Sequence, residues 1–315
     1  MLNKVKASTQ TARPPAAVEL TADGALAAAL SAAGEPVYAF VSLPEGALTP
    51  GIEPPNLRAP EAVADAIRSA LDQVSPRSRS VTLVLPDTAV RVFVLDFDAL
   101  PAKAVEAIPV LRFRLRKMVP FDVEHASVSY QVLMQTKTEC KVLTAVMPGS
   151  ILAEYEAAVR AAGYEPGAVL PSSLAALEMA DSLEAVLAAN LSGDAITTVI
   201  ATGQDLLLYR TLDLPASHAE RIAEIRRNIA VAAAYYEDKL GAPPSALHYA
   251  GNRDPREFAY WLRGSPADPA GESALSVVEL AERPQSGVLT ALGNESIAAV
   301  AGALSLSNAQ AGAAR

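Results

Sequence analysis

The chain has 315 residues, of which 51% are hydrophobic and 19% charged, and its formal net charge at pH 7 is −9. Single cores tend to split above about 250–300 residues, so the length predicts two lobes. The acidic balance argues against general nucleic-acid binding, which needs a basic surface. With one cysteine, Cys140, an internal disulfide is excluded, and we interpret the thiol as a small packing group in a reducing compartment.

Targeting and metal signals are missing from the sequence. No stretch reaches the roughly 18 apolar residues of a membrane span, and residues 1–15 lack the apolar core of a signal peptide, so they are predicted to be a flexible tail. The histidines His125, His218 and His248 are scattered, which predicts no metal site. Without a Walker A loop, a nucleophile elbow or a dinucleotide fingerprint, no catalytic residue is assigned.

The first part of the chain alternates apolar strands with one helix. Pro60 opens the helix, since proline is tolerated in a first turn. The Pro86-Asp87 pair is predicted to be a turn between two later strands. The predicted strands are Ala16–Leu20, Ala25–Leu30, Val37–Val41, Val81–Leu85 and Val90–Phe97, and the helix is Glu61–Val74.

A basic helix lies at the centre of the chain. It is predicted over Ala102–Met118 and is stopped by Pro120, which supplies no amide donor. Alternating apolar residues then predict a strand at Ser127–Leu133, and another follows at Lys141–Val146. The rest of the chain reads as the helices Ile151–Ala162, Ser172–Met179, Arg221–Leu240, Phe258–Leu262 and Ser296–Leu306, and the strands Tyr164–Leu170, Ile196–Ala201, Leu206–Arg210, Ala246–Ala250 and Ser276–Leu280.

Four motifs carry a resemblance to a known family. They are Leu100-Pro101, Val119-Pro120-Phe121, Tyr130-Gln131-Val132-Leu133, and Glu224–Ile229 followed by Tyr235-Tyr236. In these the chain resembles the PilM family, the cytoplasmic actin-like proteins of the type IV pilus inner-membrane platform, which are related to the cytoplasmic part of the type II secretion protein GspL. The resemblance implies an α/β, actin-like (ribonuclease H-like) two-lobed fold with a small inserted α+β subdomain.

The implied division of the chain has five parts. Residues 1–15 form the tail and 16–97 the first lobe. Residues 98–147 form an inserted partner-binding subdomain. Residues 148–306 form the second lobe, whose C-terminal helix returns to the first lobe, and 307–315 form a second tail.

The resemblance also implies a nucleotide site, which we interpret as degenerate. Residues 11–20 stand where the family has its first glycine-rich phosphate turn, but they lack its glycines, aspartate and lysine. The second phosphate turn is assigned to the hairpin with Gly203 and Asp205, and Gly251 replaces a glycine pair, so these three residues are the candidates for cofactor binding. No cofactor is expected; the alternative is an active ATPase that binds ATP and magnesium.

The basic helix is the stronger functional candidate. The simplest interpretation is that its arginines and lysine form a solvent-exposed helix surface with no binding role. Its functional interpretation is a partner-docking patch, because the resemblance implies a groove that takes the apolar N-terminal tail of a PilN-like bitopic membrane protein. A basic patch also suits acidic lipid. The patch residues are Arg112, Phe113, Arg114, Arg116, Lys117 and Phe121.

The expected function is therefore a cytoplasmic scaffold of type IV pilus or type II secretion-like machinery. The protein is expected at the inner face of the inner membrane, held there only indirectly through its partner. Self-association stays open, and a role in twitching motility follows from the family alone.

Overall fold

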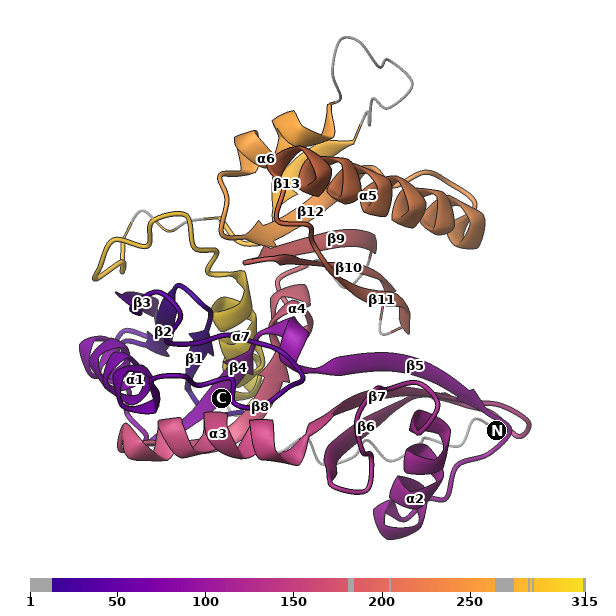
Figure 1. The fold of residues 1–315 in the computed structure, drawn as a ribbon, viewed down its shortest axis with the longest axis horizontal. Coiled ribbons are helices and arrows are strands. Elements are labelled where there is room, and N and C mark those ends of the chain that lie inside the picture. Colours follow the sequence, from indigo (N-terminus) through magenta and orange to yellow (C-terminus); the bar gives the residue numbers. More distant parts are fainter. Residues whose placement is uncertain are drawn as a thin grey trace.

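The computed structural model describes residues 13–180, 184–203, 205–263, 275–282, 284 and 286–313, without the side chains of 306–313. These residues form three β-sheets, two of five strands and one of three, with helices packed on them (Figure 1). Most of the predicted N-terminal tail, Gln204 of the predicted second phosphate turn, and residues 264–274 lie outside the described residues.

The first sheet has the strand order β3-β2-β1-β4-β8. β1, β2 and β3 form an antiparallel meander, and β4 and β8 run parallel to β1. Helices cover both faces, which explains why even the alternating positions of β1 are buried. The elements are β1 (Ala16–Leu20), β2 (Gly24–Leu30), β3 (Pro36–Ser42), β4 (Ser80–Leu85) and β8 (Glu165–Pro171), with α1 (Pro60–Val74) and α3 (Gly149–Ala161) on one face and α4 (Ser172–Leu177) and α7 (Ala298–Ala313) on the other.

The second sheet has the order β11-β10-β9-β12-β13, so its strands repeat the arrangement of the first sheet in chain order. Two helices pack on its outer face, around Ile225, Ile229 and Phe258. Its inner face joins the apolar core that α4 and α7 share with the first sheet. The elements are β9 (Ala185–Ser192), β10 (Ala195–Thr202), β11 (Asp205–Asp213), β12 (Ala246–Gly251), β13 (Ser276–Glu279), α5 (His218–Leu240) and α6 (Pro255–Leu262).

The third sheet, β5-β7-β6, is a separate small subdomain that extends away from the two lobes (Figure 1). One helix packs on it through Ala107, Leu111 and Leu115, and Cys140 is buried in the same core. Burial raises the pKa of the Cys140 thiol, which agrees with a packing role. The elements are β5 (Arg91–Phe97), β6 (Ala126–Gln135), β7 (Cys140–Pro148) and α2 (Ala104–Leu115).

The structure differs from the sequence prediction in four places. β4 and β5 do not pair, because the 3-10 turn η1 (Asp87–Ala89) sends β5 into the third sheet. β9 was not predicted at all. The second lobe was predicted to begin at residue 148, but β8 pairs with β4, and the second sheet begins only at Ala185. α7 continues to Ala313, past the predicted end at Leu306.

No helix within the described ranges is both long enough and apolar enough to cross a bilayer.

Candidate functional site

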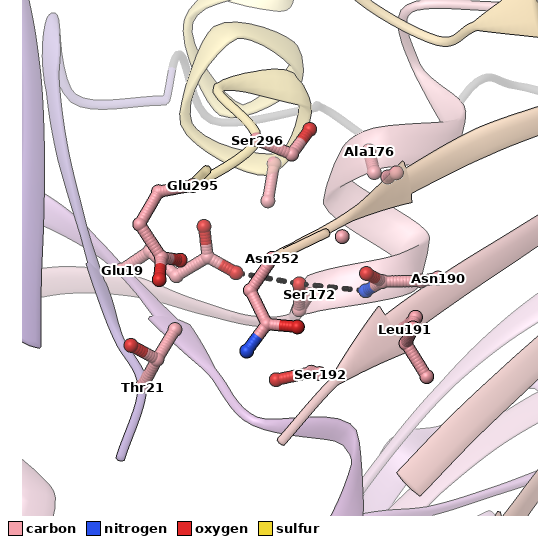
Figure 2. A pocket seen from close by; sticks show the side chains of 13 residues that line it. Glu19, Thr21, Ser172, Ala176, Asn190, Leu191, Ser192, Asn252, Glu295 and Ser296 are labelled. Carbon is pink, nitrogen blue, oxygen red and sulfur yellow. Dashed lines mark hydrogen bonds between the residues drawn. The ribbon is translucent and has the colours of Figure 1, made fainter. Parts of the chain in front are cut away.

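A small cavity lies where the two lobes meet, and it is surrounded by polar side chains (Figure 2). Its volume is about 20 Å³. The strands β1, β9 and β12 end at this cavity, and α4 and α7 begin beside it, so both lobes contribute to its wall. The lining residues are Glu19, Thr21, Ser172, Ala176, Asn190, Leu191, Ser192, Ala250, Gly251, Asn252, Glu295, Ser296 and Ala299.

Glu19 is the central acid of this cavity. The hydroxyl of Ser172 donates to its carboxylate at 2.6 Å, and Asn190 Nδ2 donates to Ser172 Oγ at 3.0 Å, as the dashed lines of Figure 2 show. The pKa of the Glu19 carboxyl is raised to about 8: burial is the largest cause, the nearby carboxyl groups of Glu295 and Asp87 add to it, and the Ser172 hydrogen bond acts in the opposite direction. At neutral pH the group is therefore largely protonated.

A second buried acid, Asp87, links the two lobes through its hydrogen bonds. Its carboxylate accepts hydrogen bonds from the Ser173 amide (3.0 Å), the Ser173 hydroxyl, the Tyr209 hydroxyl (2.7 Å) and Asn190 Nδ2 (3.4 Å). Burial raises the pKa of the Tyr209 phenol well above its usual value, and the Asp87 charge raises it further. We call the six residues Glu19, Asp87, Ser172, Ser173, Asn190 and Tyr209 the interlobe network.

A nucleotide does not fit this cavity as its side chains are arranged. Ligand sites usually measure about 300–1,000 Å³, and one water needs about 10–15 Å³. A volume of about 20 Å³ therefore holds little more than one water. The lining residues include two glutamates and no lysine or arginine, so nothing among them balances a triphosphate.

The backbone amides of the adjoining turn are also in use. In the turn between β1 and β2, the Thr21 hydroxyl oxygen accepts from the amides of Asp23 (3.3 Å) and Gly24 (3.2 Å). Asn252 Nδ2 donates a hydrogen bond to the Asp23 carboxylate at 3.1 Å, which links the two lobes. Phosphate turns work by leaving such amides free for the anion. Among the described residues, no three His, Cys, Asp or Glu side chains gather where they could hold a metal ion.

Of the three candidate cofactor residues, the structure brings only Gly251 to the cavity. Gly203 and Asp205 belong to the β10–β11 hairpin and do not line it. Gly251 has a packing reason to be glycine, because a Cβ there would lie 2.6 Å from the Leu191 carbonyl oxygen. Sequence reasoning missed Glu19, the next-to-last residue of β1, and Asn190, which lies near the end of β9.

A larger groove lies between the first lobe and the third sheet. Its volume is about 340 Å³, and none of its lining residues is charged. β6 and β8, the edge strands of two different sheets, both line it. Edge strands offer unpaired backbone N–H and C=O groups. The lining residues are Leu85, Val90, Ser127, Val128, Ser129, Tyr130, Gln131, Leu143, Ala145, Val146, Met147, Leu152, Val169, Leu170, Pro171 and Leu174.

The six predicted partner-binding residues lie elsewhere, on α2 and just after it, and none lines the groove. Arg112 donates to the carbonyl oxygens of Ala126 (2.9 Å) and Glu124, and Arg116 pairs with the Glu124 carboxylate. Phe121 packs half-buried against the α2 core. Phe113, Arg114 and Lys117 are exposed.

The chain was compared with known proteins and structures. No protein-family model matches it, and neither does any curated protein. A chain of the PilM–PilN type IV pilus biogenesis complex is similar in structure, with a TM-score of 0.72 and 18% identity over 94% of this chain and 99% of that chain.

Two further structures are similar at lower scores. The cytoplasmic domain of EpsL, an inner-membrane component of the type II secretion system of Vibrio cholerae, has a TM-score of 0.47 and 17% identity over 75% of this chain and 81% of that one. A Bacteroides thetaiotaomicron protein with an actin-like ATPase fold has a TM-score of 0.46 and 13% identity over 86% and 92% of the two chains.

The first of these likenesses, together with the repeated strand order of the two sheets, shows the fold. The chain has the predicted two-lobed, actin-like α/β fold, and the predicted resemblance to PilM is confirmed at the level of the fold.

Proposed function

We propose that this chain is a PilM-like platform protein of type IV pilus or type II secretion-like machinery, and that it holds the cytoplasmic tail of a PilN-like bitopic membrane protein. It acts as a scaffold at the inner face of the inner membrane and does not turn over nucleotide. The similar structure is of a PilM–PilN complex, which supports this choice of partner.

The observation that carries the proposal is the groove between the first lobe and the third sheet. It is about 340 Å³ in volume, and apolar side chains from β6, β7, β8 and α3 line most of it. An extended peptide can pair with an edge strand while its side chains fill apolar pockets. An uncharged groove beside two edge strands therefore suits a short apolar tail.

The alternative, an active ATPase, has weaker support. The interlobe cavity is too small for a nucleotide, its lining includes no cation, and the turn amides of Asp23 and Gly24 are bonded to Thr21. Actin-like catalysis depends on positioned charge around the phosphates. We therefore assign the chain a binding role.

The test is calorimetric titration with a synthetic N-terminal tail peptide from the PilN-like protein encoded beside this chain. Ser129 is exposed and lines the groove, so Ser129→Trp should fill the groove without disturbing the core. We expect the variant to weaken peptide binding at least about tenfold, or about 1.4 kcal/mol. The matched control is Thr138→Trp, in the exposed β6–β7 turn. Equal affinity for the two variants, or no binding by the wild type, would count against the proposal.

A further inference from the structure

The outer face of α2 presents apolar and cationic side chains that the proposed function does not use. Val105 is 77% exposed and Phe113 74% exposed. With Pro109 between them, they are spaced four residues apart and form one stripe. The stripe lies opposite Ala107, Leu111 and Leu115, which are buried against the third sheet.

Two cations flank this stripe without partners. Lys117 lies in the turn that follows α2, four residues after Phe113, and Arg114 lies about 100° further round the helix from Phe113. Neither makes an ion pair with any residue in the described ranges, whereas Arg112 and Arg116 both pair with Glu124. We call Val105, Pro109, Phe113, Arg114 and Lys117 the α2 face.

The charge of the subdomain supports a functional role for this face. Residues 91–148 contain eight lysines and arginines against six aspartates and glutamates, in a chain whose net charge is −9. The positive excess is therefore local. The helix α2 lies at the opposite end of the molecule from α5 and α6 (Figure 1).

We infer that the α2 face docks on an anionic phospholipid surface. Exposed aromatic side chains among lysines and arginines are typical of helices that lie at a bilayer interface. Phe113 would enter the headgroup layer, and Arg114 and Lys117 would contact lipid phosphates. This inference rests on the proposed function in one respect: a membrane-anchored partner held in the neighbouring groove brings α2 close to the bilayer.

A lipid surface suits this face better than a protein does. A stable protein interface buries about 800 Å² on each partner, whereas the exposed apolar side chains of the α2 face are Val105 and Phe113, at the rim of a hollow of about 440 Å³ that Arg112 and Arg116 also line. Each cation near an anionic leaflet contributes about 1 kcal/mol, and full burial of a phenylalanine contributes about 1.5–3 kcal/mol. Such binding is weak alone and becomes effective when a second attachment holds the protein in place.

The experiment is co-sedimentation of the full chain, without any partner, with vesicles of phosphatidylglycerol and phosphatidylethanolamine, and with phosphatidylcholine vesicles for comparison. The wild type should bind the anionic vesicles only, and less strongly as salt rises. The double variant Arg114→Gln/Lys117→Gln should bind about 30-fold more weakly, from about 1 kcal/mol per cation. Phe113→Ser should bind about tenfold more weakly.

The matched control lies on α6, where Tyr260 is 72% exposed and Arg263 is also exposed. Tyr260→Ser/Arg263→Gln should leave vesicle binding unchanged. The lipid inference would be overturned if the wild type failed to bind anionic vesicles, or if the α2 and α6 variants bound equally. It would also be overturned if Phe113→Ser weakened only the binding of the tail peptide, since α2 would then belong to a protein interface.

The two proposals can fail separately. Vesicle binding that is lost in the α2 variants, in a protein that binds no tail peptide, supports the lipid surface and rejects the proposed partner. If the protein binds the tail peptide but does not bind anionic vesicles, the proposed partner is supported and the lipid surface is rejected.

Discussion

At the scale of single residues, the interlobe network is the most informative feature of the molecule. Asp87 is buried, and its carboxyl group has hydrogen-bond donors from both lobes. A buried carboxylate needs such donors, because its desolvation is otherwise uncompensated. The network therefore couples the stability of the protein to the closed arrangement of its lobes.

The first prediction concerns Tyr209, whose hydroxyl donates to Asp87 at 2.7 Å. Tyr209→Phe removes one donor from a buried carboxylate, so it should lower the free energy of unfolding by about 1–3 kcal/mol. Urea unfolding measures this change. Tyr260→Phe is the control, because Tyr260 is exposed and its hydroxyl makes no hydrogen bond to the described residues. Equal stability of both variants would show that the Tyr209 bond contributes nothing.

The second prediction concerns Glu19, whose pKa is raised from 4.5 to about 8. Between these values the folded state holds a proton that the unfolded chain releases. The free energy of unfolding should therefore fall as the pH rises through this window, by up to about 1.4 kcal/mol per pH unit.

Glu19→Gln keeps the shape and removes the titration, so its stability should depend less on pH between about pH 5 and about pH 8. Thermal unfolding across that range measures the slope. Glu45→Gln, at an exposed glutamate, should keep the slope of the wild type. A wild type whose stability rises with pH across the window would contradict the assignment.

Sequence alone places Glu19 in a strand and Asp87 in a turn, but it does not show that these side chains come together in one network. Glu19 lies in the predicted strand Ala16–Leu20 and Asp87 in a predicted turn, whereas Asn190 belongs to a strand that the sequence did not predict. Asp87 and Asn190 are 103 residues apart along the chain, and their side chains meet only because the two lobes pack against each other. No local pattern carries that information.

At the scale of elements, α7 and α4 pack unusually closely. Gly302 of α7 faces α4, and a Cβ on it would lie 1.9 Å from the Ala175 carbonyl oxygen. Because backbone cannot move aside as a side chain can, only glycine permits this distance. α7 is thereby held against the first sheet near the cavity.

The third prediction follows from this contact. Gly302→Ala should force the two helices apart and destabilise the protein by about 1–3 kcal/mol or more. Gly51→Ala is the control, since a Cβ at Gly51 would meet no atom within 4 Å. Thermal unfolding compares the two variants, and matching midpoints would show that α7 adjusts without cost.

The fourth prediction separates two arginines of the same helix. Arg112 ties α2 to the carbonyl oxygens of Glu124 and Ala126, whereas Arg114 is exposed and makes no described ion pair. Arg112→Ala should cost about 1.5–3 kcal/mol, as expected for charged hydrogen bonds. Arg114→Ala should change stability by less than about 0.5 kcal/mol. Urea unfolding of the two variants measures these changes. A larger loss of unfolding free energy for Arg114→Ala than for Arg112→Ala would contradict this prediction.

Most elements could be predicted from apolar spacing, and the strand β9 is the exception. β9 reads AVLAANLS, and its three alanines and two leucines favour a helix as much as a strand. It forms a strand because it lies at the centre of the second sheet, between β10 and β12. β9 ends at the interlobe cavity, whereas the predicted residues Gly203 and Asp205 lie in the following hairpin and do not line it.

At the scale of the whole molecule, the interlobe cavity and the groove beside the third sheet differ sharply, and a further hollow of about 440 Å³ lies on the outer side of α2. The site between the lobes measures about 20 Å³ and the groove beside the inserted sheet about 340 Å³. The groove beside the third sheet has no charged lining residue, whereas the interlobe cavity is lined by two glutamates. A fold with two lobes around a cleft thus has its available volume outside that cleft.

The fifth prediction compares the two ligands on one protein. ATP with magnesium should leave the melting temperature unchanged, because nothing binds the native state preferentially. The tail peptide should raise it in a concentration-dependent way. Thermal unfolding with each ligand is the measurement. A rise with ATP that depends on Glu19 would show that the lobes open to admit a nucleotide.

The attachment of the inserted sheet has a consequence for how such proteins diversify. The chain enters this sheet at Arg91 and leaves it near Val146, and these two residues are paired on adjacent strands. An appendage grafted at two touching points can be reshaped or exchanged without shifting the body that carries it. Evolution can therefore retune what is recognised at this end of the molecule while leaving the remainder of its architecture intact.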